Sequence, residues 1–87
     1  MNTQTIKNAI AGKSPQLAIL ADAIEGGRGY EHGKEIYLSK LTYTEQCASL
    51  GLAAKYPEHV VALVTHDLSS AIIKNIGGLI EEIRIGN

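Results

Sequence analysis

Apolar residues recur at every third or fourth position in the first quarter of the chain, which is the spacing of one face of a helix. They predict a short helix over residues 3–11 and a second helix over residues 15–25. Ser14 and Pro15 mark the start of the second helix, because serine can accept a hydrogen bond from an unpaired backbone N–H and proline needs no partner at the first helical position. Gly26 marks its end. Apolar side chains surround residues 15–25 so completely that we expect this helix to be buried on more than one side.

The middle of the chain begins with a glycine-rich segment. Residues 26–34 hold four glycines and are expected to form a loop. In residues 35–39 apolar and polar positions alternate, which suits a short strand, but the sequence suggests no partner strand within the chain, so a lead into the next helix is the alternative. Thr42 and Glu45 have the spacing of a capping box and predict a helix over residues 43–55.

The last third of the chain carries a long apolar stripe, which predicts one helix, or two stacked end to end, over residues 57–84. The apolar positions follow one another every three or four residues, about 3.7 on average, which is nearer to the period of a straight helix than to that of a left-handed coiled coil. Gly77 and Gly78 weaken helix propensity, so we expect either close approach of a neighbour or a kink in the helix at this point. The stripe consists of Val61, Val64, Leu68, Ile72, Ile76, Leu79 and Ile83.

The length of this helix predicts assembly. At about 1.5 Å per residue, residues 57–84 would extend over roughly 42 Å, whereas a compact chain of 87 residues is only about 30 Å across. Part of the stripe would then project beyond its own domain and require a second chain to cover it. We therefore expect a homo-oligomer, most simply a dimer, with an interface formed by Leu68, Ile72, Ile76, Leu79 and Ile83.

Together these segments predict an all-α fold: a small helical bundle of about four helices, completed by oligomerisation, in a single domain over residues 1–87. The chain has no Phe or Trp, so its core must be built from Ile, Leu, Val and Ala. All four tyrosines lie in the middle third of the chain, and tyrosine is often placed where one end of the side chain stays in water.

The charge pattern excludes some partners. Eight basic and nine acidic residues are scattered along the chain, so no basic patch favours nucleic acid or an anionic membrane. No apolar run approaches the roughly 18 residues of a membrane span, and the first residues do not resemble a signal peptide. The single cysteine cannot form an internal disulfide, which suits a reducing compartment. We therefore expect a cytoplasmic protein.

Groups that could carry catalysis or bind a metal are sparse. His59 and His66 would stand about 10.5 Å apart along the predicted helix, too far for one metal ion. Cys47 has apolar neighbours and is expected to be a small buried hydrophobic residue. Ser69 and Ser70 have no activating partner in the sequence. We therefore expect no enzymatic activity, no metal and no cofactor.

The glycine-rich segment over residues 26–34 is the main candidate for recognition. It matches neither the Walker phosphate loop nor the dinucleotide motif, since Arg28 stands where the first Walker glycine belongs and Glu35 stands where the magnesium-binding hydroxyl belongs. Tyrosine and arginine supply much of the binding energy at protein interfaces. We therefore expect the binding surface to consist of Arg28, Tyr30, His32, Lys34, Tyr37 and Tyr43.

Three functions fit these expectations. The first is a stoichiometric protein-binding module: an inhibitor, an adaptor or a regulatory subunit. The second is a protein that binds or sequesters a small ligand, a nucleotide held by Arg28, Tyr30 and Lys34. The third is a transcriptional regulator resembling a helix-turn-helix, since Cys47 and Gly51 have that spacing, although the helix predicted to follow carries few of the side chains that read DNA bases.

Overall fold

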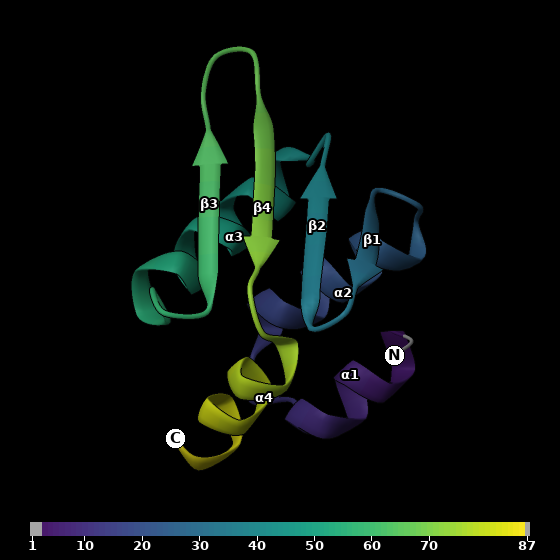
Figure 1. The fold of residues 1–87 in the computed structure, drawn as a ribbon, viewed down its shortest axis with the longest axis vertical. Coiled ribbons are helices and arrows are strands. Elements are labelled where there is room, and N and C mark those ends of the chain that lie inside the picture. The colour runs from purple at the N-terminus through teal and green to yellow at the C-terminus, as the bar shows by residue number, and fades with distance from the viewer. Residues whose placement is uncertain (1–2, 87) are drawn as a thin grey trace.

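The computed structural model describes residues 3–86 and contains both helices and strands. The elements in chain order are α1 (Thr3–Ile10), α2 (Pro15–Glu25), β1 (Gly29–His32), β2 (Glu35–Ser39), α3 (Tyr43–Lys55), β3 (Val60–Val64), β4 (Ser69–Ile73) and α4 (Ile76–Ile85). The strands form one antiparallel sheet in the order β1-β2-β4-β3 (Figure 1). The prediction of an all-α helical bundle is therefore wrong, and the fold is mixed α/β.

Helices α2 and α3 cover the ranges expected from their caps. At the start of α2, the backbone N–H of Leu17 donates to the Ser14 hydroxyl at 3.2 Å. At the start of α3 the capping box is present: the N–H of Glu45 donates to the Thr42 hydroxyl at 3.2 Å, and the N–H of Thr42 donates to the Glu45 carboxylate at 2.8 Å. These bonds join residues three apart in sequence, so the local sequence suffices to place both helix starts.

The helix predicted over residues 57–84 is not formed. A turn leads from Pro57 into β3, a hairpin returns the chain through β4, and α4 follows. Asn75 caps α4, since its side-chain oxygen accepts a hydrogen bond from the N–H of Gly78 at 3.0 Å. Both strands are rich in Val and Ile, whose branched side chains favour extended backbone. Short apolar runs fit a helical stripe and a strand equally well, and residues 60–64 and 69–73 form strands.

The predicted glycine-rich loop contains strand β1 and a tight turn. Gly33 has a φ of +64°, in the left-handed region where glycine carries no steric penalty, and it joins β1 to β2. Of the two possibilities for residues 35–39, the structure forms the strand and not a lead into the next helix. Its partner strands are β1 on one side and β4 on the other, where the sequence predicts a loop and a helix.

The core lies between the sheet and the helices. Helices α2 and α3 pack behind the sheet, while α1 and α4 pack against each other at one end of the molecule (Figure 1). The described residues extend over 35 × 24 × 22 Å, and α4 has ten residues, so the argument for an overhanging helix does not apply. The largest fully buried apolar side chains are Ile6, Ile10, Leu17, Leu20, Ile36, Leu52, Val60, Ile73, Leu79 and Ile83.

Because successive side chains of a strand point to opposite sides, the sheet has two distinct faces. The face toward α2 and α3 buries Ile36, Leu38, Val60, Ala71 and Ile73. In residues 3–86 no helix covers the other face, as Figure 1 shows. We call it the open face; the alternation assigns to it Tyr30, His32, Glu35, Tyr37, Ser39, Val61, Leu63, Ser70 and Ile72.

Candidate binding face of the sheet

A row of large side chains crosses all four strands on the open face. Tyr30 lies opposite Tyr37, Tyr37 opposite Ile72, and Ile72 opposite Val61. Side chains directly opposite one another on adjacent strands are about 4.5–5.5 Å apart at Cβ, so these four form a continuous surface, which we call the cross-strand row. Tyr30 is 62% exposed and Val61 is 43% exposed. The row therefore presents apolar and aromatic area to solvent.

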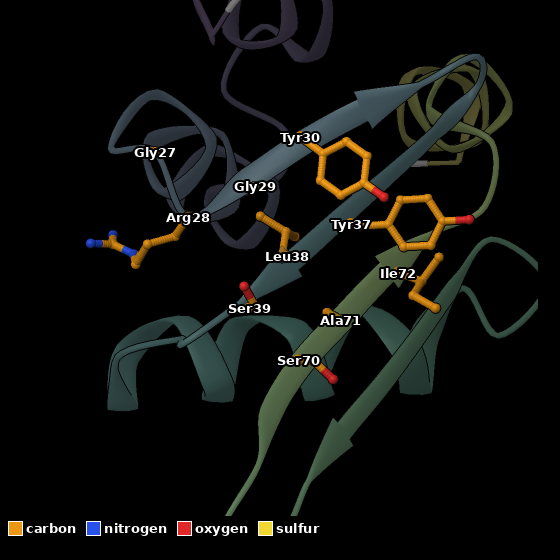
Figure 2. Close-up of a pocket in the computed structure, with 10 residues that line it drawn as sticks. All are labelled: Gly27, Arg28, Gly29, Tyr30, Tyr37, Leu38, Ser39, Ser70, Ala71 and Ile72. Atoms are coloured by element: carbon orange, nitrogen blue, oxygen red, sulfur yellow. The ribbon is translucent and has the colours of Figure 1, made fainter.

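The two tyrosines of the row form a stacked pair. The ring centroids of Tyr30 and Tyr37 are 5.3 Å apart and the ring planes differ by 18°. The Tyr37 hydroxyl donates a hydrogen bond to the Glu35 carboxylate at 2.8 Å, which fixes the ring at its outer end. Figure 2 shows the two rings side by side, with Ile72 next to Tyr37. Tyr37 is therefore held by Tyr30 and Ile72 on the two neighbouring strands and by Glu35 on its own strand.

A shallow hollow of about 350 Å³ lies beside the row. Gly29, one of its lining residues, leaves no room for a larger side chain: a Cβ there would stand 2.7 Å from Leu38 Cδ2 and 3.1 Å from the Tyr37 carbonyl oxygen. The polar groups along its wall include the hydroxyls of Ser39 and Ser70. The hollow is lined by Gly27, Arg28, Gly29, Tyr30, Tyr37, Leu38, Ser39, Ser70, Ala71 and Ile72 (Figure 2).

Arg28 is held by a structural ion pair. Its guanidinium donates a hydrogen bond to Glu45 on α3. The Glu45 side chain is 7% exposed, and its carboxylate also accepts the Thr42 N–H. In Figure 2 the Arg28 side chain points away from the tyrosine pair. Its Nε is buried and has no hydrogen-bond partner among the described residues. Arg28 therefore joins the sheet to α3, and its charge is already paired.

The other residues expected in the binding surface do not converge on one point. Tyr30 and Tyr37 meet as described. His32 and Lys34 lie at the turn between β1 and β2, both exposed. Tyr43 is the first residue of α3 and is 80% exposed. The structure thus brings together the two tyrosines, places two basic side chains at one end of the same hairpin, and puts Tyr43 on a different element.

The residues expected to form the oligomer interface are distributed over three elements. Leu79 and Ile83 are in the core of the single chain, and Ile76 is nearly as buried. Leu68 lies in the turn between β3 and β4 and is 49% exposed. Ile72 belongs to the cross-strand row. The helix that would have aligned the five side chains does not form, and the oligomeric state stays a prediction.

Glu35, Leu63 and Ser70 lie on the open face although the sequence does not predict them in the binding surface, and Val61 was expected on the helical stripe. A strand with one open face normally alternates polar and apolar residues. In β3 this alternation is absent, because Val60 and Val64 on the core face and Val61 on the open face are equally apolar. The tyrosines and the β-branched runs were the available signals. Their combination needs the strand order, which no local pattern supplies.

The open face is nearly neutral. Among the strand residues that the structure describes, Glu35 is the one carboxylate on this face, and no lysine or arginine projects from it. Within residues 3–86 no three His, Cys, Asp or Glu side chains are grouped so that they could hold a metal ion. Cys47 is exposed on α3, so the expectation that it is buried is wrong. The chemistry of this face favours contact with apolar and aromatic groups.

The contact between Tyr37 and Glu35 has a measurable consequence. The hydrogen bond to Glu35, partial burial and the charge of Glu35 together raise the pKa of Tyr37 above its ordinary value of about 10, with a smaller effect from Tyr30. Replacing Glu35 with glutamine removes the charge, so we expect the pKa of Tyr37 to fall. An NMR titration of the tyrosine ring resonances measures it. Glu58→Gln, in the exposed turn before β3, is the control and is expected to leave this pKa unchanged.

In the described range no helix is long and apolar enough to cross a membrane. Comparisons with protein-family models, with curated proteins and with solved structures gave no match.

Proposed function

We propose that this chain is a protein-binding module that docks a partner protein on the open face of its sheet. The observation that supports the proposal is the cross-strand row. Tyr30, Tyr37, Ile72 and Val61 come from four different strands, stand in register on one surface, and are not covered by any helix of residues 3–86. Tyrosines at the centre of an interface are frequent sites of large binding energy, because they bury much area while losing little side-chain entropy.

The chemistry of the face selects the class of partner. A nucleic acid would require lysine and arginine side chains to contact phosphates, and the strand residues described here offer none on this face. The second helix of a helix-turn-helix is also absent, since residues 57–64 form a turn and β3. A partner protein that contributes apolar and aromatic side chains, with hydroxyl or amide groups at the rim, matches Tyr, Ile and Val flanked by Ser39 and Ser70.

A second candidate is a small planar ligand stacked on the tyrosine pair. The hollow of about 350 Å³ falls in the size range of small-molecule sites, and its wall combines aromatic and hydroxyl groups. A nucleotide fits less well, because the cation that lines the hollow, Arg28, is already paired with Glu45. A thermal-shift screen separates the two candidates, since a ligand at 100 times its dissociation constant adds about 2.7 kcal/mol of stability.

The proposal is tested by affinity capture from the native host with quantitative mass spectrometry, comparing variants. The Tyr30→Ala/Tyr37→Ala double variant removes both rings of the row. Loss of two interface tyrosines is expected to weaken capture of the specific partner by about tenfold or more, because each such side chain commonly supplies over 1 kcal/mol.

The matched control is Tyr43→Ala, which removes an exposed tyrosine of α3 that is not on the open face. We expect it to capture the partner as well as the unmodified chain does. Thermal unfolding of all three proteins checks that the variants are folded. Equal capture by the double variant and the control would show that binding does not use the row.

A further inference from the structure

Strand β3 forms one edge of the sheet and has none of the usual features that protect an edge. Its five residues are Val-Val-Ala-Leu-Val, with no charge and no proline, and Val61 and Leu63 are 43% and 47% exposed. The opposite edge, β1, has four residues and carries Glu31 and His32. Unprotected apolar edges pair readily with another strand, and natural proteins therefore usually interrupt or cover them.

The hydrogen bonds at the two ends of β3 show which backbone groups face outward. The N–H of Lys74 donates to the His59 carbonyl at 2.7 Å, and the N–H of Thr65 donates to the Leu68 carbonyl at 2.7 Å. Because bonded positions alternate along an antiparallel pair, residues 59, 61, 63 and 65 point their backbone groups at β4. Residues 60, 62 and 64 point theirs outward.

Most of these outward groups have no partner within the described range. The N–H of Val60 donates to the Tyr56 carbonyl at 3.0 Å and is satisfied. For the N–H groups of Ala62 and Val64, and for the carbonyls of residues 60, 62 and 64, no hydrogen bond is formed inside residues 3–86. They make a short ladder of two donors and three acceptors along the free side of β3.

We infer that two copies of the chain pair through β3, antiparallel and about a two-fold axis at Ala62. In this register Ala62 lies opposite the partner's Ala62, and Val60 lies opposite the partner's Val64. The alternation then makes these the hydrogen-bonded positions, so the N–H groups of Ala62 and Val64 donate to carbonyls of the other copy. The register is self-complementary, as a two-fold interface requires. It uses both donors and two of the three acceptors that the single chain leaves unpaired; the Val64 carbonyl gains no partner, because the N–H of Val60 already donates to Tyr56.

The same register joins the apolar surfaces of the two copies. Val61 lies opposite the partner's Leu63 on the open face, and the symmetric contact repeats on the other side of the axis. Close cross-strand pairs of branched side chains stabilise antiparallel strands. Each copy thereby covers two of its exposed apolar side chains, and the sheet gains four more strands.

Pairing through β3 also enlarges the docking surface, and this step rests on the proposed function. Four strands about 4.8 Å apart and about five residues long give a face of roughly 300 Å² in projection, well short of the about 800 Å² that a stable interface covers on each partner. Two copies in one sheet present roughly twice that area as one continuous surface. The cross-strand rows of the two copies then lie on the same side of an eight-stranded sheet.

Sedimentation velocity on the full chain tests the inference. Up to about 100 µM, we expect a species of twice the 9.3 kDa mass of the chain. The Val61→Lys/Leu63→Lys variant places lysines opposite each other across the axis and is expected to sediment as a monomer. The control Tyr30→Lys/Ser39→Lys adds the same charge to the open face away from β3 and is expected to remain dimeric. A monomeric unmodified chain, or a lysine variant of β3 that stays dimeric, would overturn the inference.

Amide hydrogen exchange separates loss of the dimer from loss of the fold. In the unmodified chain the N–H groups of Ala62 and Val64 are expected to exchange slowly. In the β3 lysine variant they are expected to exchange fast, while those at positions 61 and 63, which are bonded to β4, stay slow. Fast exchange at Ala62 and Val64 in the unmodified chain would overturn the pairing. If the unmodified chain is a monomer but the Tyr30→Ala/Tyr37→Ala variant still fails to capture the partner protein, the dimer is wrong and the proposed docking face is not.

Discussion

Replacing Leu79 with alanine is expected to lower the free energy of unfolding by about 3 kcal/mol, because the side chain is fully buried and its removal leaves a cavity in the core. Leu79 lies on α4, which packs on α1 at the end of the sheet. Its burial inside one chain is what distinguishes the observed fold from a helix whose apolar stripe faces a second subunit. Urea unfolding followed by circular dichroism measures the change.

Leu68→Ala is the matched control for this prediction. The same side chain is truncated, but Leu68 lies in the turn between β3 and β4 and is 49% exposed. Its backbone, not its side chain, makes the hydrogen bonds of that turn with Thr65. We expect a loss of less than about 0.5 kcal/mol. Similar losses for the two leucines would contradict the placement of α4 in the core.

The second large effect is expected at Glu45, which links three parts of the fold. Its carboxylate accepts the N–H of Thr42 in the capping box and pairs with Arg28 at the base of β1. Glu45→Ala removes both contacts and leaves the partly buried guanidinium of Arg28 without its carboxylate partner. Because the Arg28 side chain is 34% exposed, water offsets part of that loss, and we expect destabilisation of about 2 kcal/mol.

Glu45→Gln and a double-mutant cycle separate the two contributions. Glutamine keeps a side-chain oxygen for the Thr42 N–H but loses the charge, so we expect about half of the alanine effect. In a chain that already carries Arg28→Met, Glu45→Ala is expected to cost less than it does alone, because the ion pair is gone. Equal costs in the two backgrounds, measured by urea unfolding, would show that Arg28 and Glu45 do not interact.

The parts of the fold that could be predicted are those fixed by neighbouring residues. Ser14 with Pro15 and the pair Thr42 and Glu45 place the starts of α2 and α3, since each cap joins residues three apart. Asn75 has the same role at α4, but the reading of Gly77 and Gly78 as the middle of a long helix concealed it. Of the two glycines, Gly78 does lie close to a neighbour: a Cβ there would stand 3.0 Å from His59.

The parts that could not be predicted depend on contacts between distant segments. Strands β3 and β4 carry apolar residues on both faces, so neither a period of two nor one of 3.6 dominates their sequences. Each forms a strand because it pairs with the other. The tyrosines were expected to take part in binding, but their stacking requires β1 to lie beside β2. The pairing of Arg28 with Glu45, which removes that arginine from the set of free binding groups, likewise needs the fold.

The fold and the proposed function both depend on one open face of the sheet, on which the cross-strand row is exposed. NMR on the chain with labelled tyrosine rings and isoleucine methyls, in the presence of a soluble paramagnetic probe, tests it most directly. We expect cross-strand contacts from the Tyr37 ring to Tyr30 and Ile72, and strong attenuation of the Tyr30 ring signals with little attenuation of the Ile73 methyl signals. Equal protection of Tyr30 and Ile73, or helical contacts through residues 60–73, would contradict the account.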